Sequence, residues 1–164
     1  MSRRRPLFFV LVLLAFPAIA RAVDDEPIPV PAAPAPSGPV VAPEVRYNEG
    51  LAMSKQREWR RAEQAYRDAL RGNPTLAPAW NGLGFALRQQ GQYEESLRAY
   101  YEALRLRPGY PEALEYLGEA YVQMGRLDDA RRLLDQLRAQ GAQHEAEDLA
   151  RAIAEGPSRP GASR

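Results

Sequence analysis

The sequence predicts an all-α protein: an α-solenoid of three tandem 34-residue helix-turn-helix repeats followed by a C-terminal capping helix. Two observations predict this class. Residues at matching positions recur at a fixed offset of 34 without gaps, as Gly50, Gly84 and Gly118 do. Inside each copy, apolar residues have the spacing of one helix face. The chain has 164 residues, enough for one such domain.

The N-terminal residues 1–22 have the features of a secretory signal peptide. Arg3 to Arg5 precede ten unbroken apolar residues, and Ala20-Arg21-Ala22 fits a small-x-small cleavage pattern. The apolar span 7–20 would form about 21 Å of helix, less than the roughly 30 Å hydrocarbon core. We therefore expect cleavage before Val23, or before Arg21, and an address in the periplasm or another extracytoplasmic part of the envelope. The alternative is an uncleaved inner-membrane anchor through residues 7–20, the one case in which we expect membrane contact.

A proline-rich linker is expected at residues 23–43, because seven of the fifteen prolines lie in 27–43. Proline fixes φ and lacks a backbone N–H, which excludes a helix or a central strand. An extended polyproline arm would span about 50 Å at roughly 3.1 Å per residue. Such arms can be ligands for aromatic grooves, but no P-x-x-P motif with flanking basic residues is present, so we favour a linker. The tail 156–164 is also rich in Gly and Pro and is expected to be disordered.

Three helical hairpins are expected between residues 44 and 142, in repeats of about 43–76, 77–110 and 111–142. In the middle copy, Trp80, Leu83 and Leu87 lie on one helix face, Gly91 suits a left-handed helix end, and Pro108 ends the second helix. Further sets recur at the offset of 34: Met53, Leu87 and Tyr121; Trp59, Tyr93 and Leu127; Ala62, Ser96 and Ala130; Tyr66, Tyr100 and Leu134; Ala69, Ala103 and Leu137.

The recurring glycine predicts a close approach of the two helices in each hairpin. Glycine inside a helix costs about 1 kcal/mol relative to Ala, so its presence three times at one position needs a cause. The expected small partners facing it are Ala62, Ser96 and Ala130. The repeat positions of Trp59 and Trp80 place both indoles in the core rather than in a ligand site.

The middle and third copies resemble the tetratricopeptide repeat pattern W-x2-L-G-x2-Y…A-x3-F…P. The matching residues are Trp80, Leu83, Gly84, Leu87, Ser96, Tyr100 and Pro108, then Leu114, Leu117, Gly118, Tyr121, Ala130 and Leu134. The first copy departs from the pattern, with Arg46 and Glu49 where Trp and Leu belong. These positions would pack on a preceding repeat, so we expect the array to start here.

A capping helix is expected at residues 143–155, because a solenoid must cover its last apolar face. Ala146, Leu149, Ala150 and Ile153 share one side. The opposite side carries His144, Glu147, Asp148, Arg151 and Glu155. The cluster around His144 is interpreted as a solvated helix surface, because a metal site needs three or four converging ligands.

Composition argues against most other function classes. There is no Cys and one His, and no phosphate-binding loop or nucleophile elbow is present, so we expect no enzyme, metal, cofactor or small-molecule substrate. The net charge of +1 includes four arginines in residues 1–22. The remaining chain is slightly acidic, which disfavours nucleic acid as a partner.

The resemblance implies a concave groove, lined by the first helix of each hairpin, that takes an extended or helical peptide. The lining positions would be Tyr47, Leu51, Ser54, Asn81, Phe85, Arg88, Gln89, Glu112, Glu115, Glu119 and Val122. Some family members hold a C-terminal carboxylate there, but the matching positions, among them Tyr47, Leu51, Gly82, Glu112 and Tyr116, supply no cation or suitable amide. That ligand class is therefore not expected.

Three glutamates, Glu112, Glu115 and Glu119, lie on one helix face and are expected to be unpaired. They could form a solvated surface, or they could bind Lys or Arg of a ligand whose apolar part contacts Leu51 and Phe85. The chain is then either an exported, non-catalytic scaffold that binds a partner protein or peptide, or a structural subunit of an envelope assembly without a free-peptide ligand. Such an assembly could serve secretion, pilus formation, cytochrome maturation or cell-wall synthesis.

Overall fold

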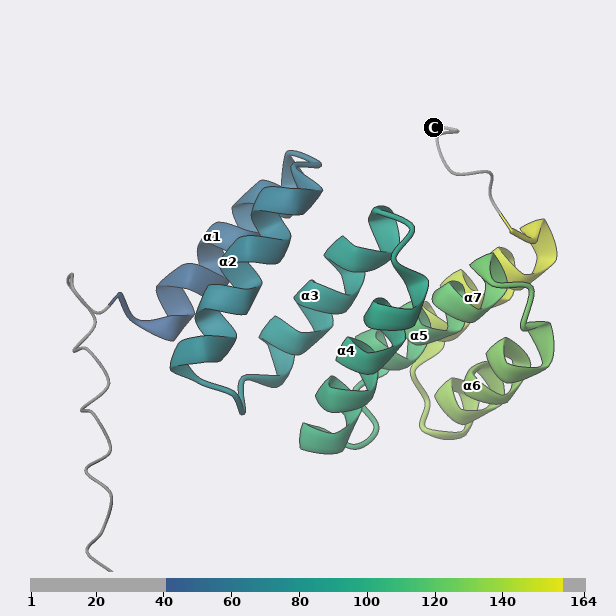
Figure 1. Cartoon of the computed structure of the whole chain (residues 1–164). Coiled ribbons are helices and arrows are strands. Elements are labelled where there is room, and N and C mark those ends of the chain that lie inside the picture. Colours follow the sequence, from purple (N-terminus) through teal and green to yellow (C-terminus); the bar gives the residue numbers. More distant parts are fainter. Residues whose placement is uncertain (1–40, 158–164) are drawn as a thin grey trace, which may run out of the picture. The chain divides into compact units, whose positions relative to one another are not determined.

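The computed structural model describes residues 41–157, all within the second of two compact units, Gly38–Arg164. The predicted signal segment, the linker up to residue 40 and the tail from residue 158 lie outside the described residues. The described part holds seven helices and no strand (Figure 1). They are α1 (Pro43–Lys55), α2 (Trp59–Gly72), α3 (Ala77–Gln89), α4 (Tyr93–Leu106), α5 (Pro111–Gln123), α6 (Leu127–Ala139) and α7 (Gln143–Glu155).

The helix starts reproduce the sequence repeat. The first helices of the three hairpins begin 34 residues apart, and each has a proline in its first two positions, where the missing N–H is not needed. The second helices begin at the matched residues Trp59, Tyr93 and Leu127. The predicted fold class, three helical hairpins followed by a capping helix, is confirmed.

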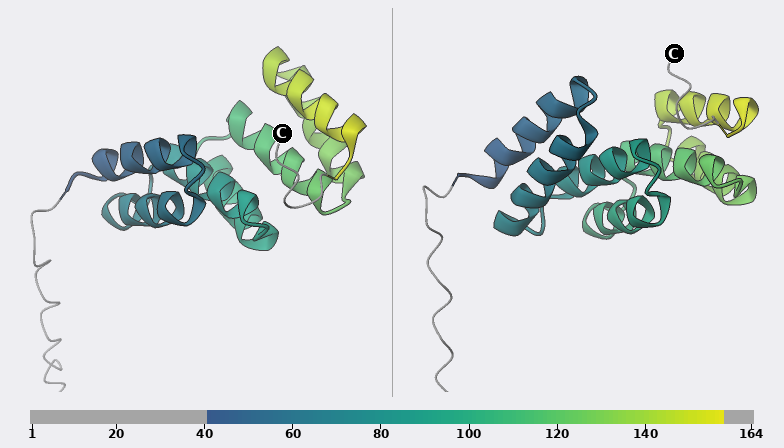
Figure 2. Two further views of the ribbon diagram at one scale, coloured as in Figure 1. Left: turned by 90° about the horizontal axis from the view of Figure 1, so that it is seen from above. Right: turned by 45° about the horizontal axis from the view of Figure 1, so that its top comes forward.

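The helices stack in a regular order within this unit (Figure 2). The first helices α1, α3 and α5 contact one another in succession, and α7 follows α5 in the same row. The second helices α2, α4 and α6 each pack on their own first helix and on the first helix that follows. One side of the array is therefore built only from first helices. No helix in the described part is long and apolar enough to cross a membrane.

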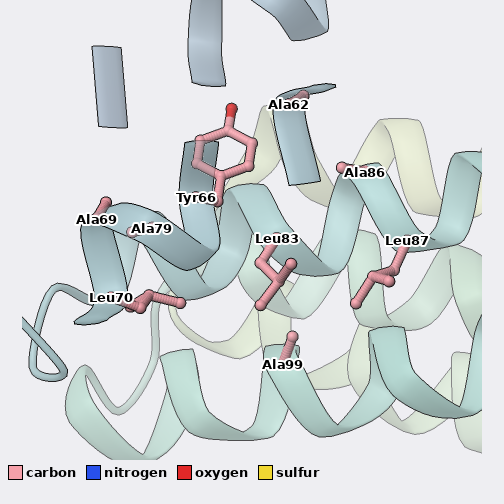
Figure 3. Close-up of a cluster of buried hydrophobic side chains, with 9 residues drawn as sticks. All are labelled: Ala62, Tyr66, Ala69, Leu70, Ala79, Leu83, Ala86, Leu87 and Ala99. Atoms are coloured by element: carbon pink, nitrogen blue, oxygen red, sulfur yellow. The ribbon is translucent and has the colours of Figure 1, made fainter. Parts of the chain in front are cut away.

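A continuous apolar core fills the spaces between hairpins. In Figure 3, Leu83 and Leu87 of α3 point toward the helix that carries Ala99. Tyr66 and Tyr100, which occupy the same position of successive repeats, are 1% and 0% exposed. Each ring therefore fills a core site that recurs with the repeat.

The recurring glycines face large side chains rather than small ones, which corrects the expectation from sequence. A Cβ on Gly50 would lie 2.6 Å from a Tyr66 ring carbon, and a Cβ on Gly84 would lie 2.6 Å from Tyr100. The glycine therefore makes room for a buried ring. Ala62, Ser96 and Ala130 are fully buried but do not supply these nearest atoms.

In the third hairpin, the space beside the recurring glycine is filled by the capping helix. Its residue at the tyrosine position is the shorter Leu134, and the nearest atoms to a Cβ on Gly118 belong to Leu149 of α7, at 2.5 Å. Leu149 and Ala146 share an apolar cluster with Leu134 and Leu137. Helix α7 therefore covers the end of the core.

Candidate functional site

A hollow of about 360 Å³ opens along α1 and α3 and reaches the start of α5. Six aromatic side chains contribute to its walls, and we call it the aromatic groove. Its lining residues are Tyr47, Leu51, Ser54, Lys55, Arg57, Trp59, Tyr66, Pro78, Asn81, Gly82, Phe85, Tyr110 and Tyr116. Five of the predicted lining residues are among them: Tyr47, Leu51, Ser54, Asn81 and Phe85.

Helical spacing produces this lining. Tyr47, Leu51 and Lys55 follow one another at intervals of four on α1, so they share one face. Gly82 lies opposite on α3, where a Cβ would be 2.5 Å from the Tyr66 ring. The missing side chain makes room for the buried Tyr66 ring, which packs against Gly82 at the floor of the groove. The Tyr66 hydroxyl lies 3.2 Å from the hydroxyl of Ser54 at the rim.

A row of rings continues from the first hairpin toward α5. Trp59 meets Phe85 edge-on with ring centroids 5.7 Å apart, and Phe85 lies 5.2 Å from Tyr116. The guanidinium of Arg88 lies over both Phe85 and Tyr116, at 5.3 and 5.8 Å from the ring centroids. This contact holds the Phe85 ring in place at the end of the row.

Asn81 brings an unsatisfied acceptor into this apolar setting. The residue is 8% exposed, and its Oδ1 atom is buried without a hydrogen-bond partner in the described part of the chain. A buried polar atom without a partner costs about 1–3 kcal/mol. The Asn81 side chain also lies within hydrogen-bonding reach of the Tyr110 hydroxyl, an interaction that lowers the pKa of Tyr110, so the amide is a polar group fixed among the aromatic side chains of the groove.

The two ends of the groove differ in charge. Lys55 and Arg57 line one end and make no ion pair among residues 41–157. Near the other end, burial raises the pKa of Tyr47 and Tyr110, and the negative charge of Glu112 raises both further. A ligand with one acidic end would therefore be oriented by the groove.

The acidic part of the site differs in the structure from what the sequence predicted. Glu119 is not unpaired, because its carboxylate lies 2.6 Å from the guanidinium of Arg88. Glu115 is only 8% exposed, and burial, followed by the charges of Glu119, Asp148 and Glu145, raises its pKa to about 8. It is therefore mostly protonated at neutral pH.

The remaining predicted residues are spread over different surroundings. Arg88, Glu115 and Glu119 do not line the aromatic groove but form a cluster of their own, in which Glu115 is buried and the Arg88–Glu119 ion pair is partly buried. Glu112 is exposed, and Gln89 lines a separate hollow of about 770 Å³ with Glu58, Trp59 and other residues. The structure therefore brings together the apolar half of the predicted site.

The two tryptophans have different roles, which corrects the expectation that both are core residues. Trp80 packs against two core clusters, and its indole Nε1 donates a hydrogen bond to the carbonyl oxygen of Pro74 at 2.8 Å. Trp59 belongs to none of these clusters and lines the aromatic groove. The prediction missed several aromatic residues of the groove, and the sequence offers one signal for them. At the position of Gly82 the next repeat has the large Tyr116.

Two family models, both described as tetratricopeptide repeat, match residues 47–111 and 87–156. No curated protein sequence matches the chain. Together the two models span residues 47–156, which include six of the described helices in full and α1 from Tyr47 onward.

Solved structures with the same fold include the TPR2B domain of yeast Sti1, in a complex with pHsp70, with a TM-score of 0.64 and 19% identity over 69% of this chain and 96% of that one. The Arabidopsis OM64 TPR domain has a TM-score of 0.64 and 18% identity, over 72% and 98% of the two chains. The second TPR of Spaghetti (RPAP3), bound to the HSP90 peptide SRMEEVD, has a TM-score of 0.58 and 19% identity, over 61% and 93%. At these identities the likeness concerns the fold.

Proposed function

The chain belongs to the tetratricopeptide repeat family, and from this premise we propose that it is a non-catalytic interaction module whose aromatic groove binds an extended segment of a partner protein. The observation that carries the proposal is the groove itself, an apolar hollow of about 360 Å³ lined by six aromatic side chains with the polar Asn81 among them. Grooves of this kind use apolar walls for affinity and a few polar groups for orientation.

The solved relatives support this proposal, because the Sti1 and Spaghetti domains are in complexes with pHsp70 and an HSP90 peptide. The ligand chemistry proposed here is different. The positions expected to hold a terminal carboxylate carry Tyr47, Leu51, Gly82, Glu112 and Tyr116. We therefore propose an internal apolar segment as the ligand, with an acidic group at the Lys55 end.

We also propose that the module acts outside the cytoplasm, in the periplasm or another part of the cell envelope. Support comes from the basic start, the apolar run and the Ala20-Arg21-Ala22 pattern in residues 1–22. The mass of the intact protein from its native envelope fraction tests this. We expect a chain that begins at Val23 or Arg21, and a mass that retains residues 1–20 would contradict cleavage.

Partner capture from that envelope fraction tests the groove. Leu51→Asp places a charge in the apolar wall and should abolish capture, whereas Val45→Asp is the matched control. Both residues are exposed and apolar on α1, at 36% and 47%, but only Leu51 lines the groove. Equal capture by the two variants, at equal thermal stability, would overturn the proposal.

A further inference from the structure

The hollow that Gln89 lines, of about 770 Å³, meets the aromatic groove at Trp59, whose half-buried side chain lines both spaces. The α1–α2 and α3–α4 turns lie at the same edge of the array (Figure 1), and both contribute to this hollow, which we call the turn hollow. One wall is formed by residues 58–61, and the other by Gln89, Gln90 and Gln92. A segment that leaves the aromatic groove beside Lys55 and Arg57 can therefore continue past Trp59 into the turn hollow.

Three cations around Trp59 have no acidic partner. Lys55, Arg57 and Arg60 make no ion pair within residues 41–157, where almost every other arginine makes one. Glu58 is the one acidic residue of this turn, and its carboxylate is paired with Arg61. The turn therefore presents positive charge that the described part of the chain does not neutralise.

The positive charge belongs to the first hairpin alone. The first turn of α2 contains no acidic residue and carries Arg60 and Arg61. The matching positions of α4 and α6 are all acidic: Glu94, Glu95, Asp128 and Asp129. Basic residues are unfavourable at a helix start, because its free N–H groups carry partial positive charge. The first hairpin therefore gives up a stabilising arrangement that the other two have.

The backbone of the same turn has a second unfavourable feature. Arg57 has φ 59°, a left-handed conformation that the matching turns leave to Gly91 and Gly125. A strained residue that lines a groove indicates a role for its side chain in function. Two independent costs thus fall on one turn, and both place basic side chains beside Trp59.

We propose that the partner segment has two parts: an apolar stretch that lies in the aromatic groove and, next to it, a run of acidic residues that lies in the turn hollow and binds Lys55, Arg57 and Arg60. This rests on the proposed function and names the chemical class of its partner. Charge complementarity at the turn then sets the specificity and the direction in which the segment binds.

The dimensions of the two spaces set the pattern of the segment. Tyr47 and Lys55 are eight residues apart on α1, about 12 Å of helix, which an extended segment spans with about four residues. The acidic residues then follow beside Trp59. The exposed amide groups of Gln89 and Gln92 add N–H donors for carboxylates, whereas the amide of Gln90 already donates to Glu63.

A short acidic segment fits this site better than a broad anionic surface such as a membrane. The basic residues border a hollow that continues an apolar groove. Acidic residues also outnumber basic ones in residues 41–157 as a whole. A wide anionic surface would therefore be repelled by much of the domain, whereas a segment held at the turn meets the local positive charge.

Selection from a library of random peptides against the chain from residue 23 onward tests the proposal. We expect enriched peptides to carry apolar residues beside two or more acidic residues. Combining Lys55→Glu, Arg57→Glu and Arg60→Glu should replace the acidic residues of the selected peptides with Lys or Arg and leave the apolar stretch. The control is Arg105→Glu with Arg131→Glu and Arg138→Glu, an equal change in net charge at exposed positions of α4 and α6, which should select the same peptides as the parent.

The affinity of one enriched peptide gives the second readout. We expect the reversal at the turn to weaken binding about ten-fold at low salt, and the difference to shrink as salt rises. Arg57→Gly removes one charge and also relieves the strained backbone, so it should weaken binding while raising the thermal stability of the chain. A weaker complex of a more stable protein separates a binding role of Arg57 from a role in folding.

The other outcomes would overturn the proposal in distinct ways. Enriched peptides that are apolar but lack acidic residues would remove the role of the turn and leave the aromatic groove as a binding site. Acidic peptides that bind Leu51→Asp as tightly as the parent would show that the turn acts without the groove. If no acidic peptide is enriched and the parent binds phosphatidylglycerol vesicles that the reversed variant does not, the turn faces a membrane. Failure of the proposed function is seen separately, as equal partner capture by Leu51→Asp and Val45→Asp.

Discussion

Arg57 and Gly91 occupy the same position of successive hairpin turns, and both have left-handed backbone, with φ 59° and 76°. Glycine adopts this conformation without a steric cost, whereas other residues lose about 1–2 kcal/mol there. The first hairpin therefore carries a strain that the second avoids, at a residue that lines the aromatic groove.

Replacing Arg57 with glycine should stabilise the domain. We expect Arg57→Gly to raise the free energy of unfolding by about 1 kcal/mol, measured by urea denaturation. Arg57→Asn, which also removes the charge but tolerates this conformation less well than glycine, should give a smaller gain. A loss of stability in Arg57→Gly would instead show that the guanidinium makes a stabilising contact.

Alanine at the recurring glycine should cost different amounts in the second and third hairpins. In Gly84→Ala the new methyl group meets the buried ring of Tyr100, which has little freedom to move, and we expect a loss of about 2 kcal/mol. In Gly118→Ala the nearest atoms are the terminal methyl groups of Leu149, which can rotate away. Equal losses in thermal unfolding would contradict this distinction.

The buried carboxyl group of Glu115 should make stability depend on pH. Its pKa rises from an ordinary 4.5 to about 8 in the folded state, because of burial and the charges of Glu119, Asp148 and Glu145. The contribution of this carboxyl group to the free energy of unfolding is fully present below pH 4.5 and is lost as the pH rises through 8. We therefore expect the melting temperature of Glu115→Gln to exceed that of the parent protein, by a difference that grows between pH 5 and pH 9.

The matched control for this titration is Glu112→Gln on the same helix. Glu112 is exposed, so its replacement removes a negative charge without changing a buried group. If the melting temperatures of the parent and Glu115→Gln change with pH in the same way across this range, Glu115 is not a carboxyl group that is protonated in the folded state and ionised in the unfolded chain.

The two tryptophans should separate stability from binding. Trp80→Ala removes a core contact and the hydrogen bond to Pro74, and we expect a loss of about 3 kcal/mol. Trp59→Ala should lose less than half of this and weaken partner capture, because Trp59 lines the groove and contacts Phe85. Greater destabilisation by Trp59→Ala than by Trp80→Ala would place Trp59 in the core.

The array could be predicted because its determinants are local and repeated. The offset of 34 places Trp59, Tyr93 and Leu127 at successive helix starts, and Gly91 at a left-handed turn, as the structure shows. These features depend on neighbours within a few residues. Repetition then shows them several times in one sequence.

The candidate site was less predictable because its properties depend on contacts between repeats. Glu119 and Arg88 are paired across two hairpins, and no pattern on either helix indicates this. The burial of Glu115 requires α7 to dock beside α5. Likewise, the space at Gly118 is filled by a residue from outside its own repeat, which the repeat pattern does not predict.

This use of Leu149 has a consequence for protein engineering. Additional repeat units could be inserted between residues 110 and 111. Such units would then have a complete hairpin before them and another after them, as the middle repeat does. Units appended after residue 139 would separate Leu149 from Gly118 and leave the last glycine without a side chain against it. The scaffold can therefore be lengthened from within, while its C-terminal end fixes where the array stops.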